Sequence, residues 1–131
     1  MKLDAIQARL QTAIPSLSAI YLFGSRARGT AGPDSDADLA ILADAPPDPV
    51  ALWTLAGDLA DLAGCPVDLV DLRAASTVMQ YQIIMAGRRL WARDAGVDLY
   101  ETFILSEKTA LDEARARLLG DIAREGRIHG R

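Results

Sequence analysis

The chain has 131 residues, half of them apolar, which suffices for one packed domain and excludes an intrinsically disordered protein. Its net charge of −4, with arginines scattered along the sequence, excludes the dense basic footprint of a general nucleic-acid-binding protein. Cys65 is the one cysteine in the sequence, which excludes an intrachain disulfide and predicts a cytoplasmic location.

Helical and extended patterns alternate along the chain. Apolar residues at helical spacing predict a first helix that ends at Pro15. Four strands are predicted, the last one short and at a sheet edge, over residues 19–23, 36–42, 66–72 and 88–92. Three further helices are predicted, over residues 50–63, 76 to about 86, and 97 to about 124. Trp53 and Trp91 lie on apolar stripes, so we expect both in the core.

The order of these elements predicts an α+β fold. The first two strands are joined by a 12-residue loop, which favours a hairpin, and the helix between the second and third strands favours a crossover connection. We expect a small mixed sheet of three to four strands with helices packed on it, followed by a long C-terminal helix. One domain over residues 1–131 is expected, with its core at about 1–93 and the C-terminal helix at about 97–124.

The densest chemistry lies in the stretch FGSRARGTAGPDSDADLAIL, residues 23–42. Side chains on a strand alternate between faces, so Asp36 and Asp38 point the same way. Two carboxylates on one face beside an apolar run repel each other unless a cation offsets their charge. Hard divalent cations with oxygen ligands, Mg²⁺ above all, suit such a pair.

The loop before these aspartates has the features of an anion site. Gly24 follows the first strand and would let the backbone approach a ligand closely, and backbone N–H groups at the start of a helical turn attract anions. Ser25 adds a hydroxyl donor, and Arg26 and Arg28 offer guanidinium groups to phosphate oxygens. Phosphate on one side and metal on the other is the arrangement that nucleotidyl transfer needs.

Ordinary explanations exist for each part of this pattern. An Asp-x-Asp sequence is common in acidic proteins, and the GSRARG stretch could be a solvated turn. A Walker A loop is excluded because no Gly-Lys-Ser/Thr follows. Asp68 and Asp71 lie in a further apolar strand, where an unpaired carboxylate is costly. Being three apart they face opposite sides, so at most one of them can join Asp36 and Asp38.

These residues resemble a known family. Gly24-Ser25, ten residues and then Asp36-Ala37-Asp38 is similar to the signature of the polymerase-β-type nucleotidyltransferase superfamily. The later VDLVDL, followed by a helix and GRRLW, resembles its small single-domain branch, the minimal nucleotidyltransferases. The resemblance covers roughly residues 19–91 and implies a polymerase-β-like core.

The resemblance implies roles for the residues that match the signature. Gly24 and Ser25 would hold the triphosphate of a nucleotide, and Asp36 and Asp38 would bind one or two Mg²⁺ ions. Asp68 is the best match to the third carboxylate of the family, which ligates the metal and helps remove a proton from the nucleophile.

Other residues match the family pattern less well. Asp71 is the less favoured candidate for the third carboxylate. Arg28 would contact phosphate, with Arg26 as a weaker candidate, and Trp91 could lie near the nucleotide instead of in the core.

The resemblance also implies an acceptor and a partner. Minimal nucleotidyltransferases are commonly encoded beside a HEPN-domain ribonuclease toxin, and as its antitoxin they move AMP from ATP onto a toxin tyrosine. We therefore expect a protein adenylyltransferase that binds this toxin as a hetero-oligomer, without direct contact to nucleic acid or membrane. Two alternatives remain: a nucleotidyltransferase for aminoglycoside-like small molecules, completed by a partner or by dimerisation, and an antitoxin that acts by binding alone.

Overall fold

The computed structural model describes residues 1–32 and 34–129, with side chains as far as residue 125. The helices are α1 (Leu3–Ala13), α2 (Ser25–Arg28), α3 (Pro49–Ala63), α4 (Thr77–Ala86) and α5 (Gly96–His129), with a 3-10 turn at Leu72–Ala74. The strands are β1 (Leu17–Phe23), β2 (Ala37–Ala43), β3 (Val67–Asp71) and β4 (Arg88–Ala92). This is the α+β fold with a mixed four-stranded sheet that the sequence predicts.

The sheet has the strand order β3-β2-β1-β4. β1 pairs antiparallel with both β2 and β4, which confirms the expected hairpin and the edge position of β4. β2 and β3 pair in parallel, because α3 carries the chain back to the same end of the sheet as a crossover. Helix α3 is capped at its N-terminus by Asp48, whose side chain accepts a hydrogen bond from the Val50 N–H. The helix stops at Gly64, which has a left-handed φ of 72°.

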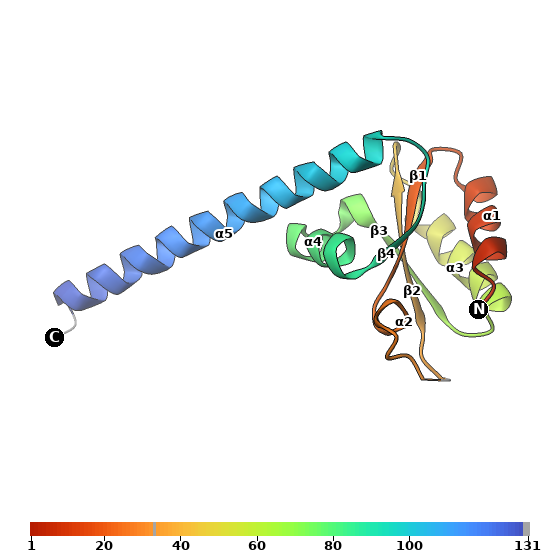
Figure 1. The fold of residues 1–131 in the computed structure, drawn as a ribbon, viewed down its shortest axis with the longest axis horizontal. Helices are drawn as coiled ribbons and strands as arrows, with labels where there is room; N and C mark the ends of the chain where they lie inside the picture. The colour runs from red at the N-terminus through yellow and green to blue at the C-terminus, as the bar shows by residue number, and fades with distance from the viewer. Residues whose placement is uncertain (33, 130–131) are drawn as a thin grey trace.

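Helices cover both faces of the sheet (Figure 1). The face toward α1 and α3 holds a buried cluster that includes Ile6, Leu10, Leu39, Ile41 and Leu59. The face toward α4 and the start of α5 holds a second cluster, which includes Tyr21, Leu42, Leu72, Ile83 and Val97. Because β-strand side chains alternate, successive residues from Ala19 to Leu22 in β1 and from Leu39 to Ala43 in β2 enter opposite clusters, so these central strands contribute to both.

The long helix α5 packs on the body only at its beginning. Val97 and Ile104 are buried, and the Tyr100 hydroxyl donates a hydrogen bond to the side-chain oxygen of Gln80 on α4. Further along, Leu111, Leu118, Leu119 and Ile122 are exposed. Figure 1 shows this part of α5 extending away from the sheet. Within the described residues no helix combines the length and apolarity required to span a bilayer.

The position of Trp53 differs from the sequence expectation. Its side chain is 83% exposed on α3, whereas the same helix buries Leu55 and Leu59. Leu52 and Ala63 of the same helix also pack against the cluster under α1 and α3, so Trp53 lies outside the face that contacts the sheet. Trp91 is half-buried and packs against the cluster under α1 and α3, as expected.

Candidate active site at one end of the sheet

The end of β1 and the start of β2 approach each other closely at Gly24 and Asp38. Gly24 has a φ of 71° and a ψ of −155°, a conformation that residues with a side chain rarely adopt. A Cβ atom placed on Gly24 would lie 2.1 Å from Asp38 Oδ2. The glycine therefore makes a turn and also leaves the space that the Asp38 carboxylate fills.

The three candidate carboxylates lie at this same end of the sheet. Asp38 is the register partner of Phe23 on one side and of Asp68 on the other. Asp38 and Asp68 thus extend from neighbouring strands on one face, toward α4. Asp36 lies just before β2, which begins at Ala37 and not at residue 36 as the sequence pattern predicts.

Electrostatics reflects how close these groups are. Burial, together with repulsion from Asp68 and Asp36, raises the pKa of the Asp38 carboxyl above its ordinary value. The Arg28 guanidinium partly offsets this rise in pKa. The ionised form of Asp38 is therefore disfavoured in this environment, and a bound cation would stabilise it.

Asp71 lies elsewhere. It is three residues beyond Asp68, roughly 10 Å along the strand, and its register partner is Ile41 of the opposite face. Its carboxylate accepts a hydrogen bond from the Arg73 N–H and caps the 3-10 turn. Of the two aspartates in this strand, the geometry places Asp68 beside Asp38.

The two loop arginines have different surroundings. Arg26 Nη2 donates to the Ser35 carbonyl at 2.8 Å, which ties α2 to the segment that leads into β2. Its Nε atom is buried and has no hydrogen-bond partner among the described residues. Arg28 is exposed, acts on the pKa of Asp38, and lines a cavity together with Gly24.

This cavity lies between the loop after β1 and helix α4. Its volume is about 440 Å³, the size expected for a site that takes a small organic ligand. One wall is Phe23, Gly24 and Arg28, and the other comes from α4 and its end, namely Met79, Gln82, Ile83, Ala86 and Gly87. It therefore opens beside the carboxylates and on their face of the sheet.

Known proteins share this arrangement. Residues 4–96 match the family described as polymerase beta, nucleotidyltransferase. The chain belongs to this family. Protein adenylyltransferase MntA of Shewanella oneidensis is 40% identical over 113 residues, which span 86% of this chain and 81% of that protein.

Two solved structures resemble this nucleotidyltransferase closely. One is a crystal structure of a toxin–antitoxin with AMP-PNP, matched with a TM-score of 0.83 and 37% identity over 94% of this chain and 99% of that one. The other is a tri-AMPylated Shewanella oneidensis HEPN toxin in complex with MNT antitoxin, matched with a TM-score of 0.75 and 36% identity over 92% and 94% of the two chains.

A divalent cation suits the donor set of this nucleotidyltransferase. Asp36, Asp38 and Asp68 offer only carboxylate oxygens, the ligands that Mg²⁺ prefers, and burial together with repulsion from Asp68 and Asp36 raises the pKa of Asp38. Among the described residues, no three acidic, histidine or cysteine side chains stand close enough to share one ion as they are now oriented. Binding an ion through all three would therefore require side-chain rotation, which is open to the exposed Asp36 and Asp68.

Sequence reasoning missed the contribution of α4 to the site. Its residues carry no charged signature, so Met79 and Gln82 gave no signal. Gly87 was expected only as a helix stop, but a Cβ there would lie 2.3 Å from the Ile83 carbonyl oxygen and 2.9 Å from that of Leu22. This glycine lets α4 end directly against β1 and so closes the cavity.

Proposed function

We propose that this nucleotidyltransferase transfers AMP from ATP to a tyrosine hydroxyl of a HEPN ribonuclease partner, and that it acts as the antitoxin of that partner. One observation carries the proposal: Asp38, the register partner of Asp68, stands against Gly24, and Gly24 lines a cavity of nucleotide size. Relatives with 36–40% identity support it, because they are described as a protein adenylyltransferase and as the antitoxin bound to an AMPylated HEPN toxin.

Gly24, Ser25 and Arg28 would position the donor nucleotide. Ser25 opens the short helix α2, and Arg28 lies at its end and lines the cavity. The guanidinium of Arg28 would contact phosphate oxygens directly. Arg26 would support the loop through Ser35, and its role toward phosphate is secondary.

The transfer step is a displacement at the α-phosphorus of ATP. The tyrosine oxygen forms a bond to this phosphorus while the bond from phosphorus to the bridging oxygen of the β-phosphate breaks, and pyrophosphate leaves with that electron pair. The phenolic proton passes to a carboxylate, for which Asp68 is the candidate. Mg²⁺ held by Asp36, Asp38 and Asp68 would neutralise charge on the phosphates and the attacking oxygen.

The proposal is tested with the purified protein, ATP, Mg²⁺ and the HEPN protein encoded next to it. We expect a mass increase of one AMP or more on the partner, located on tyrosine by peptide mapping. The double variant D36N/D38N should abolish the increase, and Asp71→Asn, its matched control on the other face, should retain it. Label from ATP on an aminoglycoside-like molecule instead of the partner would contradict the proposal, as would full protection of cells by the double variant.

A further inference from the structure

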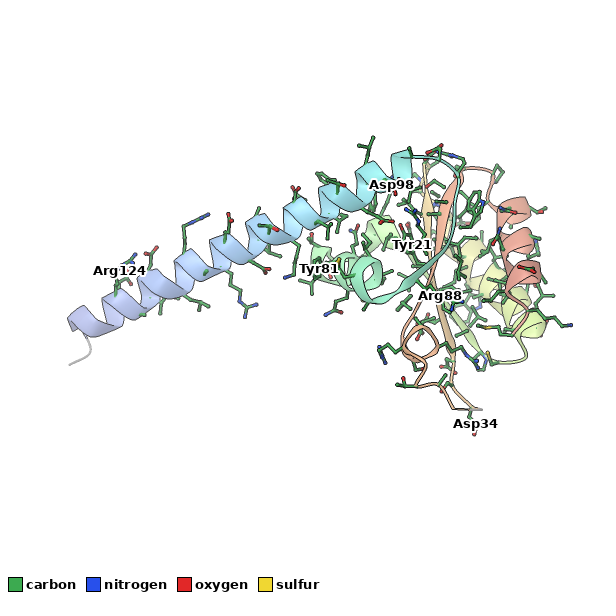
Figure 2. The ribbon with its side chains drawn as sticks, in the orientation of Figure 1. Tyr21, Asp34, Tyr81, Arg88, Asp98 and Arg124 are labelled. Carbon is green, nitrogen blue, oxygen red and sulfur yellow. The ribbon has the colours of Figure 1, made fainter. Side chains whose placement is uncertain are left out.

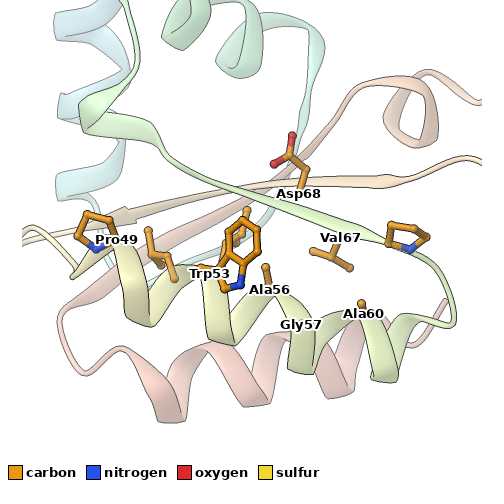
Figure 3. A pocket seen from close by; sticks show the side chains of 10 residues that line it. Pro49, Trp53, Ala56, Gly57, Ala60, Val67 and Asp68 are labelled. Carbon is orange, nitrogen blue, oxygen red and sulfur yellow. The ribbon is translucent and has the colours of Figure 1, made fainter.

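A second hollow lies at the edge of the sheet, between α3 and β3. Its volume is about 540 Å³ and its lining is mainly apolar (Figure 3). Ala56, Gly57 and Ala60 on α3 are too small to fill the space in front of β3, and Trp53 forms a wall. The indole of Trp53 is 83% exposed, an unusual position for the largest apolar side chain of this helix.

This groove reaches the candidate active site through Asp68. The residue lines the groove and is also the register partner of Asp38. Figure 3 shows Val67 pointing toward α3, whereas the carboxylate of Asp68 points to the other side of β3. Asp68 therefore lies at the boundary between the groove and the face that carries the carboxylates.

The order of strands separates the two hollows. The cavity beside Gly24 lies at β1 and the start of β4, Asp36 and Asp38 belong to the start of β2, and Asp68 with the groove belongs to β3 at the edge. In an in-line displacement the attacking oxygen approaches from the side opposite the leaving group. If the phosphates occupy the Gly24 side, the attacking hydroxyl arrives from the β3 side.

We propose that the groove binds the acceptor segment of the partner protein, the stretch whose hydroxyl receives AMP. This inference rests on the proposed function. An exposed tryptophan beside a hollow of small residues is the kind of anchor that dominates protein interfaces, because its burial by a partner removes a large apolar area from water. Asp68, exposed in the lining, gives the groove a negative charge at the end that adjoins Asp38, which would favour a basic side chain in the bound segment.

The apolar residues exposed on the far part of α5 do not fulfil this role. Leu118 and Ile122 lie on the extension of α5 that leads away from the sheet (Figure 1). A segment bound there would lie away from β3 and its Asp68. The groove, by contrast, includes Asp68 in its own lining.

Two variants test the groove from opposite directions. Trp53→Ala removes the wall, and Gly57→Leu fills the hollow, where a Cβ on Gly57 meets no atom within 4 Å. Leucine also favours helix over glycine, so this variant should fold at least as well as the wild type. Val50→Ala is the matched control, because Val50 is 71% exposed on the same helix and does not line the groove.

The readouts are AMP transfer as a function of partner concentration, AMP-PNP affinity, and thermal midpoint. We expect W53A and G57L to raise the KM for the partner about 10-fold or more, as loss of one interface anchor does, with AMP-PNP affinity unchanged. V50A should match the wild type in all three. Wild-type KM in both groove variants would overturn the proposal while leaving the adenylyltransferase activity intact.

Partner affinity is also measured in the D36N/D38N background, where no transfer is expected. There, weaker partner binding on adding W53A supports the groove even if the wild type transfers no AMP, and unchanged binding overturns it. A loss of affinity for Leu118→Ser but not for W53A would place the partner on α5 alone and would likewise overturn the proposal.

Discussion

The carboxylate of Asp38 occupies the space in which a side chain on Gly24 would begin. Asp38 Oδ2 is 2.1 Å from the position of that missing Cβ, so the loop after β1 and the start of β2 can approach this closely only with glycine at position 24. Asp38 is also the register partner of Asp68 on β3. The loop at Gly24 and the Asp38 carboxylate are therefore packed against each other, and a change in either should displace the other.

Gly24→Ala should push the loop after β1 away from the Asp38 carboxylate. The variant combines a strained backbone, which costs about 1–3 kcal/mol, with displacement of the Asp38 carboxylate, and we expect AMP transfer to fall at least about 10-fold. Gly29→Ala is the control, because Gly29 also has a positive φ of 73° but its Cβ would meet no atom within 4 Å. It should lose about 1 kcal/mol of stability and keep its activity. Equal activity losses in the two variants would contradict the role of the Gly24 contact.

Asp38→Asn should stabilise the fold while removing activity. The raised pKa of Asp38 means that the folded protein disfavours its ionised form, so at neutral pH this carboxylate lowers the free energy of unfolding. The amide has the same shape and no charge. We expect AMP transfer to fall at least about 100-fold and the thermal midpoint in metal-free buffer to rise.

The pH dependence of this stabilisation has a defined sign. A raised carboxyl pKa costs stability above that pKa, and the cost disappears as the pH falls through it and the folded protein takes up the proton. The advantage of D38N over the wild type should therefore be largest near neutral pH and shrink toward about pH 4. Thermal unfolding across this pH range measures it. A midpoint difference that grows on acidification would show that Asp38 is not destabilised by its neighbours.

Arg28→Gln should weaken nucleotide binding without changing the fold. Arg28 is exposed, lines the cavity beside Gly24 and lowers the pKa of Asp38. Loss of a charge-assisted contact to phosphate should reduce AMP-PNP affinity by roughly 10- to 100-fold, with little change in thermal midpoint. Calorimetric titration with AMP-PNP measures the affinity. Arg88→Gln, an exposed arginine at the start of β4 that does not line the cavity, is the control and should bind AMP-PNP like the wild type.

Tyr21→Phe should destabilise the attachment of α5. Tyr21 lies on the sheet near the beginning of α5 (Figure 2). Its buried hydroxyl donates a 2.6 Å hydrogen bond to Glu101, which also accepts from Arg89 Nη1 at 3.2 Å. Burial and the Glu101 carboxylate raise the pKa of Tyr21, so the phenol stays a neutral donor at working pH. Loss of this bond should cost about 1–2 kcal/mol in the free energy of unfolding, measured by denaturant titration. Tyr81→Phe keeps its ring 5.0 Å from Lys108 Nζ and should unfold like the wild type.

The strands could be predicted from sequence because apolar runs with turn residues at their ends are a local signal. β4 begins and ends where the pattern predicts, and β1 and β3 differ by at most two residues at either end. Helix α2 could not be predicted as an element, since four residues contain no repeat. Strand alternation separated Asp68 from Asp71, but only the pairing of β3 with β2, a contact between distant segments, places Asp68 at the site.

Apolar stripes were less reliable on helices than on strands. The pattern predicts one apolar stripe along α5 from Tyr100 to Ile122, but Ile104 is buried whereas Leu111, Leu118 and Ile122 are exposed. Periodicity reports that a face is apolar and not what covers it. For the same reason Trp53 was expected in the core, although it lies on the wall of the groove.

The length of α5 exceeds the diameter of a small protein domain. A helix of 34 residues extends about 51 Å, whereas a compact domain of 100 residues is roughly 35 Å across. A compact partner of that size could not cover the whole length of α5. The helix would therefore act as a spacer between a partner bound at its far part and one bound at the groove of β3. We expect that shortening α5 by whole turns would change how many partner copies bind and leave the chemistry of a single transfer unchanged.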